Sequence, residues 1–382
     1  MSAQLVEGSL QAPAAEAPPD ADSVTDPDVD PDGQVSFAVE IEVVTVPVTV
    51  TDRSGELVTD MNQSEFTILD NGVVQKIEGF ELSWDPLSLA VLLETSSRVQ
   101  SVIPEIRRTG ILLTQLILGA TGEAVVLTFD REVRIAQGFT QNAEEIESAI
   151  RAISPGGEQV RLTDAMARAV SLLQRRPQGR RKIIIVISEA RDHGSSAHQG
   201  FVLRGAQQLG ISVYTVSLST WKGVAGRLSS VSSPFPPGVV PMPMPGGQPP
   251  IPDAQTNWGA ANVNILEIIT ELVTSTKSFL GANPLKLYST GTGGMNFSSG
   301  DKAQMEQALA QIGQELRSQY LISYRPNNLD RPGFHTIEVS VSRPDVRTRT
   351  RPGYMFTRSS RKTNASSGQT SNLSEEAASS QQ

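Results

Sequence analysis

Hydrophobic residues in the middle of the chain occur as short, unbroken runs, each followed by a longer amphipathic stretch. The runs are rich in Ile, Val and Leu and cover residues 87–93, 124–129, 182–187 and 211–217. Runs without alternation are typical of strands that are covered on both faces, so they predict a parallel sheet with helices on either side. The helices are expected at residues 99–118, 142–153, 163–174, 197–209, 265–279 and 301–317.

The two regions that flank this part alternate with the period of two that is typical of antiparallel strands. Residues 43–51 are rich in β-branched side chains, and Asp70-Asn71-Gly72 separates two apolar runs as a hairpin turn does. The same alternation returns at residues 320–324, 336–342 and 346–350. Neither region holds enough strands to form a stable sheet alone, so we expect them to pair into one sandwich.

The sequence therefore predicts an α/β fold in which a doubly wound, mainly parallel sheet is inserted into an antiparallel β-sandwich. The α/β domain is expected at residues 85–318, and the two halves of the sandwich at residues 36–84 and 319–356. Residues 1–35 and 357–382 are polar and poor in large apolar side chains, which predicts disorder. Residues 222–262 are rich in proline and are expected to form a Pro/Gly-rich loop insertion.

One stretch of the acidic lead matches the opening of a calcium loop. Asp28, Asp30 and Asp32 alternate before Gly33, but the twelfth position of such a loop would be Val39, and no flanking helices are predicted. A solvated acidic segment is therefore the favoured interpretation.

The sequence predicts no segment that crosses or targets a membrane. No apolar run of 18 residues is present, so no membrane span is expected. No export signal is expected at the start of the sequence as given. If the start site is misassigned and a signal was lost with it, secretion is the favoured location.

Charge and cysteine content exclude several classes of protein. The 382 residues carry a net charge of −9 and no cysteine, which excludes disulfide scaffolds, thiol nucleophiles and cysteine-based metal sites. Residues 1–35 hold eight acidic residues and no Lys or Arg, so the rest of the chain is close to neutral.

Motifs typical of enzymes are missing from the sequence. No nucleophile elbow or phosphate loop is present, and Gly293-Gly294 is interpreted as a helix-to-strand turn. We expect no enzyme, because His193 and His198 lack a partnered nucleophile and are interpreted as exposed loop residues.

Basic residues form two groups, and neither favours a nucleic-acid partner. One group surrounds the turn into a central strand and the other alternates near the end of the sandwich: Arg175, Arg176, Arg180, Arg181 and Lys182, then Arg347, Arg349 and Arg351. With 5% aromatic residues and a nearly neutral body, the chain lacks the stacking side chains and the positive field of nucleic-acid-binding domains. Both groups are interpreted as solvated faces, and contact of the second group with the acidic lead or with a partner is the alternative.

Ligands of doubly wound sheets bind beside the carboxyl ends of the strands, where this chain has two loops of hydroxyl and charged residues. The loops read Glu94-Thr-Ser-Ser-Arg98 after the first strand and Ser188-Glu-Ala-Arg-Asp192 after the third. Here the sequence resembles the von Willebrand factor type A domain, and more closely the bacterial, acidobacterial-type proteins related to it. The resemblance covers residues 37–356 and includes further motifs: Val46-Pro-Val-Thr-Val-Thr-Asp52, Ser64-Glu-Phe66, Leu69-Asp-Asn-Gly72, Gly156-Gly157, Asp164-Ala165, Glu315-Leu-Arg-Ser-Gln-Tyr320 and Arg351-Pro-Gly-Tyr354.

The resemblance implies a metal-ion-dependent adhesion site made of an Asp-x-Ser-x-Ser loop, a threonine and a further aspartate. In this chain those positions fall on Glu94, Ser96 and Arg98, on Val160 with Thr163 close by, and on Glu189. A hard divalent ion prefers an octahedral set of oxygens, which a guanidinium and a valine do not supply, so no metal cofactor is expected. If Mg²⁺ or Mn²⁺ binds at all, its ligands would be Glu94, Ser96, Thr163 and Glu189.

The substitutions suggest a replacement for the ion. Arg98, facing Glu94 and Glu189, would supply the positive charge that the metal normally gives. Solvated loop charges and a residual metal site are the alternatives.

The function that we expect is that of a non-enzymatic adhesion-type module, which binds a protein or glycan through its strand ends and its Pro-rich loop. A structural or assembly component that associates through the sandwich edges and the Pro-rich loop is the alternative. Neither the ligand nor the oligomeric state is predicted by the sequence.

Overall fold

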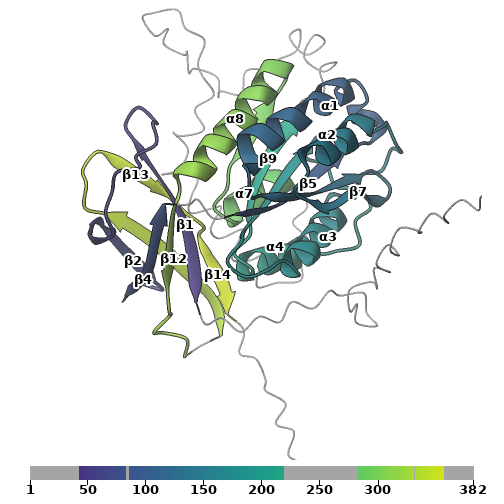
Figure 1. Cartoon of the computed structure of the whole chain (residues 1–382). Helices are drawn as coiled ribbons and strands as arrows, with labels where there is room; N and C mark the ends of the chain where they lie inside the picture. Colours follow the sequence, from purple (N-terminus) through teal and green to yellow (C-terminus); the bar gives the residue numbers. More distant parts are fainter. Residues whose placement is uncertain (1–42, 83–85, 219–282, 331, 357–382) are drawn as a thin grey trace, which may run out of the picture. The chain divides into compact units, whose positions relative to one another are not determined.

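The computed structural model describes residues 43–82, 86–218, 283–330 and 332–356. The acidic lead with its candidate calcium loop, the Pro-rich insertion, the expected helix at residues 265–279 and the C-terminal tail lie outside the described residues. The described part contains one mixed sheet covered by helices and two antiparallel sheets (Figure 1).

The central sheet has six strands in the order β10-β9-β8-β5-β6-β7. They are β5 (Leu87–Glu94), β6 (Glu123–Phe129), β7 (Val133–Thr140), β8 (Arg181–Ser188), β9 (Ser212–Leu218) and β10 (Asn296–Ser299). Neighbouring strands are parallel except β6 and β7. The four predicted strands are confirmed as β5, β6, β8 and β9. The sequence did not predict β7, because this edge strand is largely exposed and has no continuous apolar run.

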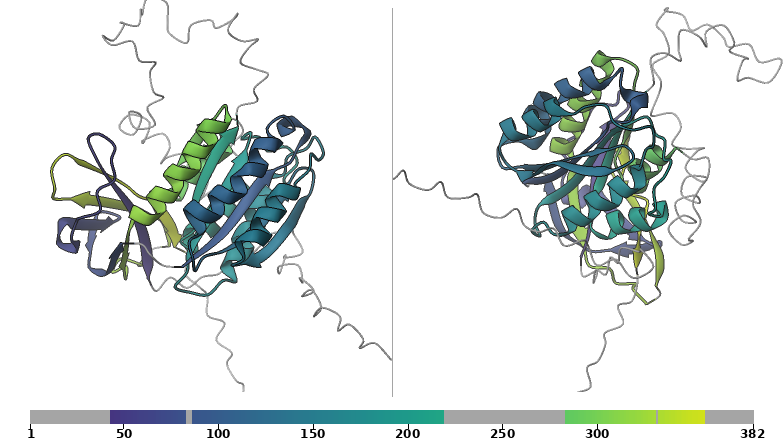
Figure 2. Two further views of the ribbon diagram at one scale, coloured as in Figure 1. Left: turned by 45° about the horizontal axis from the view of Figure 1, so that its top comes forward. Right: turned by 90° about the vertical axis from the view of Figure 1, so that its right-hand side faces the viewer.

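Helices cover both faces of the central sheet (Figure 2). On one face lie α1 (Ile103–Leu112), its π-helical continuation η3 (Leu113–Leu118), α2 (Ala143–Ala152) and α8 (Lys302–Ser318). On the other face lie α3 (Leu162–Gln174), α4 (Gln199–Gln208) and α7 (Pro284–Gly291). The predicted helix over residues 99–118 is divided, because the short helix η2 (Ser97–Val99) precedes α1 and η3 follows it. The helix-to-strand turn at Gly293 is confirmed by its left-handed φ of 79° between α7 and β10.

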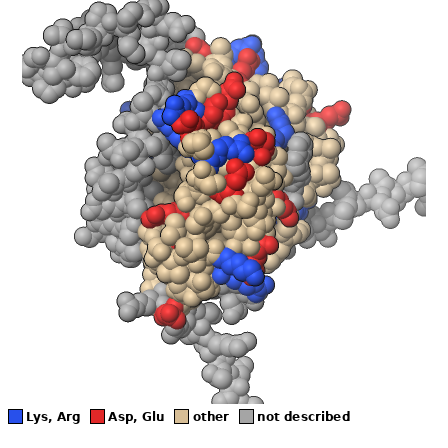
Figure 3. All heavy atoms as spheres, turned by 90° about the vertical axis from the view of Figure 1, so that its left-hand side faces the viewer, with Lys and Arg blue, Asp and Glu red and all other residues tan. Residues whose placement is uncertain are grey.

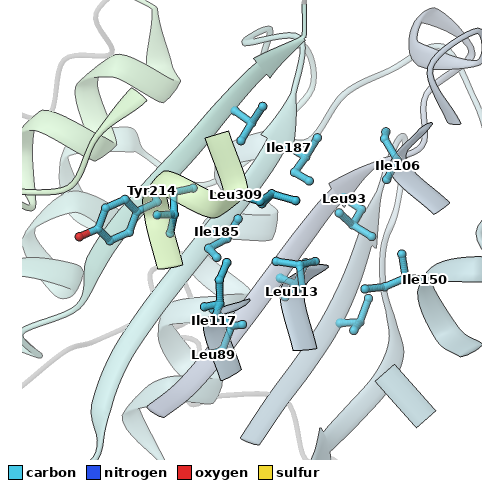
Figure 4. Close-up of a cluster of buried hydrophobic side chains, with 14 of the residues drawn as sticks. Leu89, Leu93, Ile106, Leu113, Ile117, Ile150, Ile185, Ile187, Tyr214 and Leu309 are labelled. Carbon is cyan, nitrogen blue, oxygen red and sulfur yellow. The ribbon is translucent and has the colours of Figure 1, made fainter. Parts of the chain in front are cut away.

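Alternate side chains of β5 enter the two cores. Leu89 and Leu93 lie in the core under α1, α2 and α8, whereas Ala90 and Leu92 lie in the core under α3, α4 and α7. Figure 4 shows the first core, in which Leu89 and Leu93 lie among residues of the covering helices such as Ile106. Burial on both faces is the physical reason for the unbroken apolar runs in the sequence.

The sandwich consists of two four-stranded antiparallel sheets, in the orders β13-β1-β11-β4 and β14-β12-β2-β3. Its strands come from both ends of the described chain: β1 (Val44–Asp52), β2 (Phe66–Asp70), β3 (Val73–Gln75) and β4 (Ile77–Leu82), then β11 (Tyr320–Tyr324), β12 (Gly333–Val341), β13 (Val346–Arg349) and β14 (Gly353–Phe356). Each sheet mixes the two sets, as in the pairing of Val48 on β1 with Tyr320 on β11. This confirms the predicted insertion of an α/β fold into a sandwich.

Two arginines that the sequence placed on a solvated face are buried instead. Arg349 of β13 forms an ion pair with Glu315 of α8, and its guanidinium donates to the carbonyl oxygen of Gly293 at 2.6 Å. Arg351 donates to the carbonyl oxygen of Gln207 in α4 at 2.6 Å. The interpretation as a solvated or partner-binding face is wrong for Arg349 and Arg351, because their guanidinium groups bind to Glu315, Gly293 and Gln207 of the α/β domain.

Three members of the basic group around the start of β8, Arg176, Arg180 and Arg181, are also engaged within the chain. Glu123 accepts from Arg176 at 2.7 Å and pairs with Arg180 at 3.2 Å, while Arg181 is buried and donates to the carbonyl oxygen of Leu316 at 2.6 Å. Burial raises the pKa of Glu123, but Arg176 and the hydroxyl of Ser88 outweigh burial and hold it below its usual range. On the face shown in Figure 3, basic and acidic side chains lie next to one another.

Candidate functional site

The carboxyl ends of β5, β6 and β8 place three loops side by side. The loop after β5 is tied to β6 by the amide of Thr95, which donates to the carbonyl oxygen of Phe129 at 2.9 Å. Gly156 donates to the carbonyl oxygen of Thr95 at 2.6 Å, and Ser97 donates to that of Gly157 at 2.9 Å. These backbone bonds hold the loop after β5 against β6 and against the loop between α2 and α3, so side chains that are distant in sequence meet at one edge of the sheet.

Glu94, the last residue of β5, is completely buried and lies at the centre of this edge. Its carboxylate accepts hydrogen bonds from the hydroxyl of Ser96 at 2.5 Å, the hydroxyl of Ser188 at 2.7 Å and the amide of Glu189 at 2.8 Å. All three partners are donors, so the carboxyl oxygens of Glu94 are the shared acceptor of this edge. Glu94 thereby joins the loop after β5 to the loop after β8.

Glu189 and Arg98 form an ion pair above Glu94 in these two loops. Nε of Arg98 lies 3.1 Å from Oε2 of Glu189, and the side chains are 42% and 5% exposed. Oε1 of Glu189 is buried and accepts no hydrogen bond from the part of the chain that the structure describes. Of the two carboxylates expected to face Arg98, the structure pairs Glu189 with it, and among the described residues no bond joins Arg98 to Glu94.

Thr163 and Val160 lie in a neighbouring cluster rather than around Glu94. The hydroxyl of Thr163 donates to Asp192, its amide donates to the same carboxylate at 3.1 Å, and the hydroxyl of Tyr288 donates to Thr163 at 3.2 Å. Val160 is buried and forms a backbone bridge with His193. Burial raises the pKa of Tyr288 far above its ordinary value, so its hydroxyl stays a donor. The sequence offered one signal for Asp192, its position three residues after Glu189.

Asp130 is a site residue that sequence reasoning missed. It directly follows β6, is completely buried, and accepts from the amides of Glu132 and Gly157 at 2.9 Å each. Burial raises the pKa of Asp130, but these amides and Arg134, 3.3 Å away, outweigh burial and lower it below its usual value. The available signal was its place at the carboxyl end of a predicted strand, the same signal that singled out Glu94.

Gly156 is required by the close approach of Asp130. A Cβ atom at position 156 would lie 1.7 Å from Oδ2 of Asp130, whereas one at Gly157 would meet the exposed, flexible side chain of Arg131 at 3.1 Å. We therefore expect Gly156→Ala to lower the free energy of unfolding by about 1–3 kcal/mol through overpacking. Gly157→Ala is the matched control, for which urea denaturation should give a loss of less than about 1 kcal/mol. Equal losses in the two variants would contradict this account.

The acidic and histidine side chains of the described ranges form no cluster suited to a metal ion. Within them, no three His, Asp or Glu side chains converge as they would around a metal ion. His193 and His198 are exposed, as expected. No helix within the described ranges is long and apolar enough to cross a membrane.

The comparisons with solved structures return proteins of low sequence identity. An aerotolerance-related membrane protein of Bacteroides fragilis aligns with 14% identity and a TM-score of 0.37, over 60% of this chain and 99% of its own. BatB of Bacteroides thetaiotaomicron aligns with 12% identity and a TM-score of 0.39, over 60% of this chain and 98% of its own. Proximal thread matrix protein 1 of the mussel byssus aligns with 11% identity and a TM-score of 0.39, over 62% of this chain and 49% of its own. No protein of curated function matches the sequence.

A family match covers the loops around Glu94, although Glu94 itself lies one residue before it. Residues 95–191 match the von Willebrand factor type A domain, and this range includes the loops that carry Arg98, Asp130, Gly156 and Glu189. Domains of this type generally serve adhesion and protein interaction and are generally not enzymes. The segment 95–191, which supplies β6, β7 and β8 of the mixed sheet and the helices α1, α2 and α3, is thus similar to a von Willebrand factor type A domain.

Proposed function

We propose that the protein is a non-enzymatic adhesion-type module that binds a protein or glycan at the carboxyl-end face of its α/β domain without a metal ion. The observation that carries the proposal is the ion pair of Arg98 with Glu189 beside the buried carboxylate of Glu94. The face is made of loops on a rigid sheet, an arrangement that suits recognition. The finer resemblance, to bacterial proteins with the same flanking sandwich motifs, is part of this proposal.

The residues present do not fit a divalent ion. Mg²⁺ requires nearly octahedral oxygen ligands at about 2.0–2.1 Å. Position 98 offers a guanidinium, and the side chain of Val160 offers no polar atom. Both carboxylate oxygens of Glu94 already accept hydrogen bonds within the chain. Arg98 supplies the positive charge beside Glu189 instead, and its exposed side chain forms part of the recognition face.

Calorimetric titration with MgCl₂ and MnCl₂ tests the metal-free proposal. We expect no saturable heat for the natural protein. Arg98→Ser is the informative variant, because it removes the guanidinium and restores a hydroxyl oxygen at the matching position of the adhesion loop. Saturable binding by the natural protein would overturn the proposal, and binding that appears only in Arg98→Ser would support Arg98 as the replacement for the ion.

Partner binding through this face is tested by affinity capture with altered protein as bait. The double variant Arg98→Ala with Glu189→Gln should lose the captured partner, because both members of the ion pair at this face are removed. Glu158→Gln is the matched control, since Glu158 is an exposed carboxylate on a neighbouring loop of the same face. Retention of the partner by the double variant would exclude this face as the binding site.

A second candidate function, assembly through the sandwich edges, is favoured by one observation. Val73 and Val74 of the edge strand β3 are 43% and 60% exposed, and exposed apolar edge strands invite pairing with another chain. Size-exclusion chromatography with light scattering separates the two functions. A defined large homo-assembly that Val74→Lys disperses would favour assembly over ligand recognition.

A further inference from the structure

Glu189 has an unused acceptor inside the site. Its side chain is 5% exposed, Oε2 accepts from Arg98, and Oε1 is buried with no hydrogen-bond donor in the described part of the chain. A buried carboxylate oxygen without a donor costs free energy, because desolvation is not repaid. The next residue, Ala190, has a left-handed φ of 64°, which a non-glycine residue adopts only when its surroundings impose it.

Arg98 binds one of the two carboxylate oxygens of Glu189. The structure gives one hydrogen bond, from Nε of Arg98 to Oε2 of Glu189, although a guanidinium is able to bind both oxygens of a carboxylate with two parallel bonds. Arg98 is also 42% exposed, and an ion pair with one exposed member is weak. The contact is therefore one that a better-placed cation could replace.

The charge at the centre of the site also favours a cation. Glu94 and Glu189 both have buried side chains, and the backbone amide of Glu189 donates to the carboxylate of Glu94. Arg98 is the one cationic side chain bonded to either carboxylate among the described residues. Asp130 and Asp164, in the neighbouring loops, have arginine partners of their own in Arg134 and Arg161. The formal charges of Glu94, Glu189 and Arg98 therefore sum to −1.

We infer that a cationic side chain of a protein partner, arginine or lysine, displaces Arg98 from Glu189 and occupies both carboxylate oxygens. Arg98 is then an internal ligand that covers the site until a partner arrives. This inference rests on the proposed function and names its partner class: a protein segment that presents a guanidinium or ammonium group. No covalent step is involved, and the exchange replaces one hydrogen bond with two.

Titration of the ¹⁵N-labelled full chain with N-acetylarginine N-methylamide, followed by NMR, tests this inference. We expect saturable shifts of the Glu189 and Ala190 amides, because the first donates to Glu94 and the second adjoins the site. Arg98→Ala should bind the probe about fivefold more tightly, since the internal competitor is gone. Glu189→Gln should lose saturable binding, whereas the control Glu158→Gln should bind like the natural protein.

Two outcomes of the titration would overturn the inference. Unchanged or weaker binding of the probe by the Arg98→Ala variant would overturn the inference, and this exposed substitution is expected to leave folding intact. Equal shifts with N-acetylglutamate N-methylamide would also overturn it, because they would show binding that ignores charge. If the captured partner depends on this face while the arginine probe does not bind, the partner class is wrong and the proposed function stands.

Discussion

Glu315→Ala is expected to lower the free energy of unfolding by about 3–5 kcal/mol, the largest effect among the substitutions considered. Glu315 of α8 is 5% exposed and forms an ion pair with Arg349, whose side chain is 10% exposed. Burial lowers the pKa of Arg349, but the charge of Glu315 outweighs burial and raises it above its usual value. Removing the carboxylate leaves a charged guanidinium unpaired in the interior, which is the costly way to break a buried ion pair.

The loss should be large also because Glu315 serves both parts of the fold. Its Oε1 accepts from the hydroxyl of Tyr214 on β9 at 2.7 Å, from that of Thr49 on β1 at 3.3 Å and from Gln319 at 3.0 Å. Strands β1 and β13 belong to the sandwich, whereas β9 and α8 belong to the α/β domain. The substitution therefore takes away one acceptor that is shared by donors of the sandwich and donors of the α/β domain.

Urea denaturation followed by circular dichroism measures this effect. Glu306→Ala is the matched control, because Glu306 lies on the same helix, its side chain is 46% exposed, and its partner Lys302 is exposed as well. The control should change the free energy of unfolding by less than about 0.5 kcal/mol. A loss below about 1 kcal/mol for Glu315→Ala would show that the junction does not depend on this ion pair.

Asp70→Ala is expected to cost about 3–4 kcal/mol, because several buried donors lose one acceptor. Asp70 ends β2 and is completely buried in the sandwich. Its carboxylate accepts from the hydroxyls of Tyr324 and Tyr354 at 2.8 Å each, and Nδ1 of His335 lies 2.7 Å away. Burial raises the pKa of both tyrosines far above the ordinary value, so they stay protonated and need an acceptor at every pH at which the protein is studied.

Thermal or urea unfolding of Asp70→Ala, Asp70→Asn and Asp345→Ala separates the causes. Asp70→Asn keeps the shape and one acceptor oxygen, so its loss should be about half that of Asp70→Ala. Asp345 is 58% exposed and pairs with the exposed Arg53, so its replacement should have little effect. Similar losses for Asp70→Ala and Asp345→Ala would contradict the role given to the buried network.

The elements of the fold were predicted well where their patterns are local. The unbroken apolar runs of β5, β6, β8 and β9 and the period-two alternation of the sandwich strands each reflect burial within a few neighbouring residues. The edge strand β7 and the eight-residue helix α7 were not predicted. The first is mostly exposed and the second is short, so neither imposes a strong period on the sequence.

The candidate site was predicted in part, through loops that directly follow strands. Glu94, Ser96, Arg98 and Glu189 were identified from their positions in two such loops, and the structure joins them through one chain of contacts. Asp130 follows a predicted strand in the same way but matches no motif. Its role in the site comes from the hydrogen bond that it accepts from Gly157, 27 residues further along the chain. A sequence read locally does not report such a partner.

The sequence by itself determined the alternation of strands and helices, the insertion of the α/β fold into a sandwich, and the strand ends at which charged side chains gather. The tertiary structure alone decided which charges are solvated and which are buried: Arg349 meets Glu315, and Asp70 meets Tyr324 and Tyr354. The physical reason is that hydrophobic periodicity records burial of the nearby backbone. The partner of a charge is fixed by packing, and Asp70 and Tyr354 are 284 residues apart in the chain.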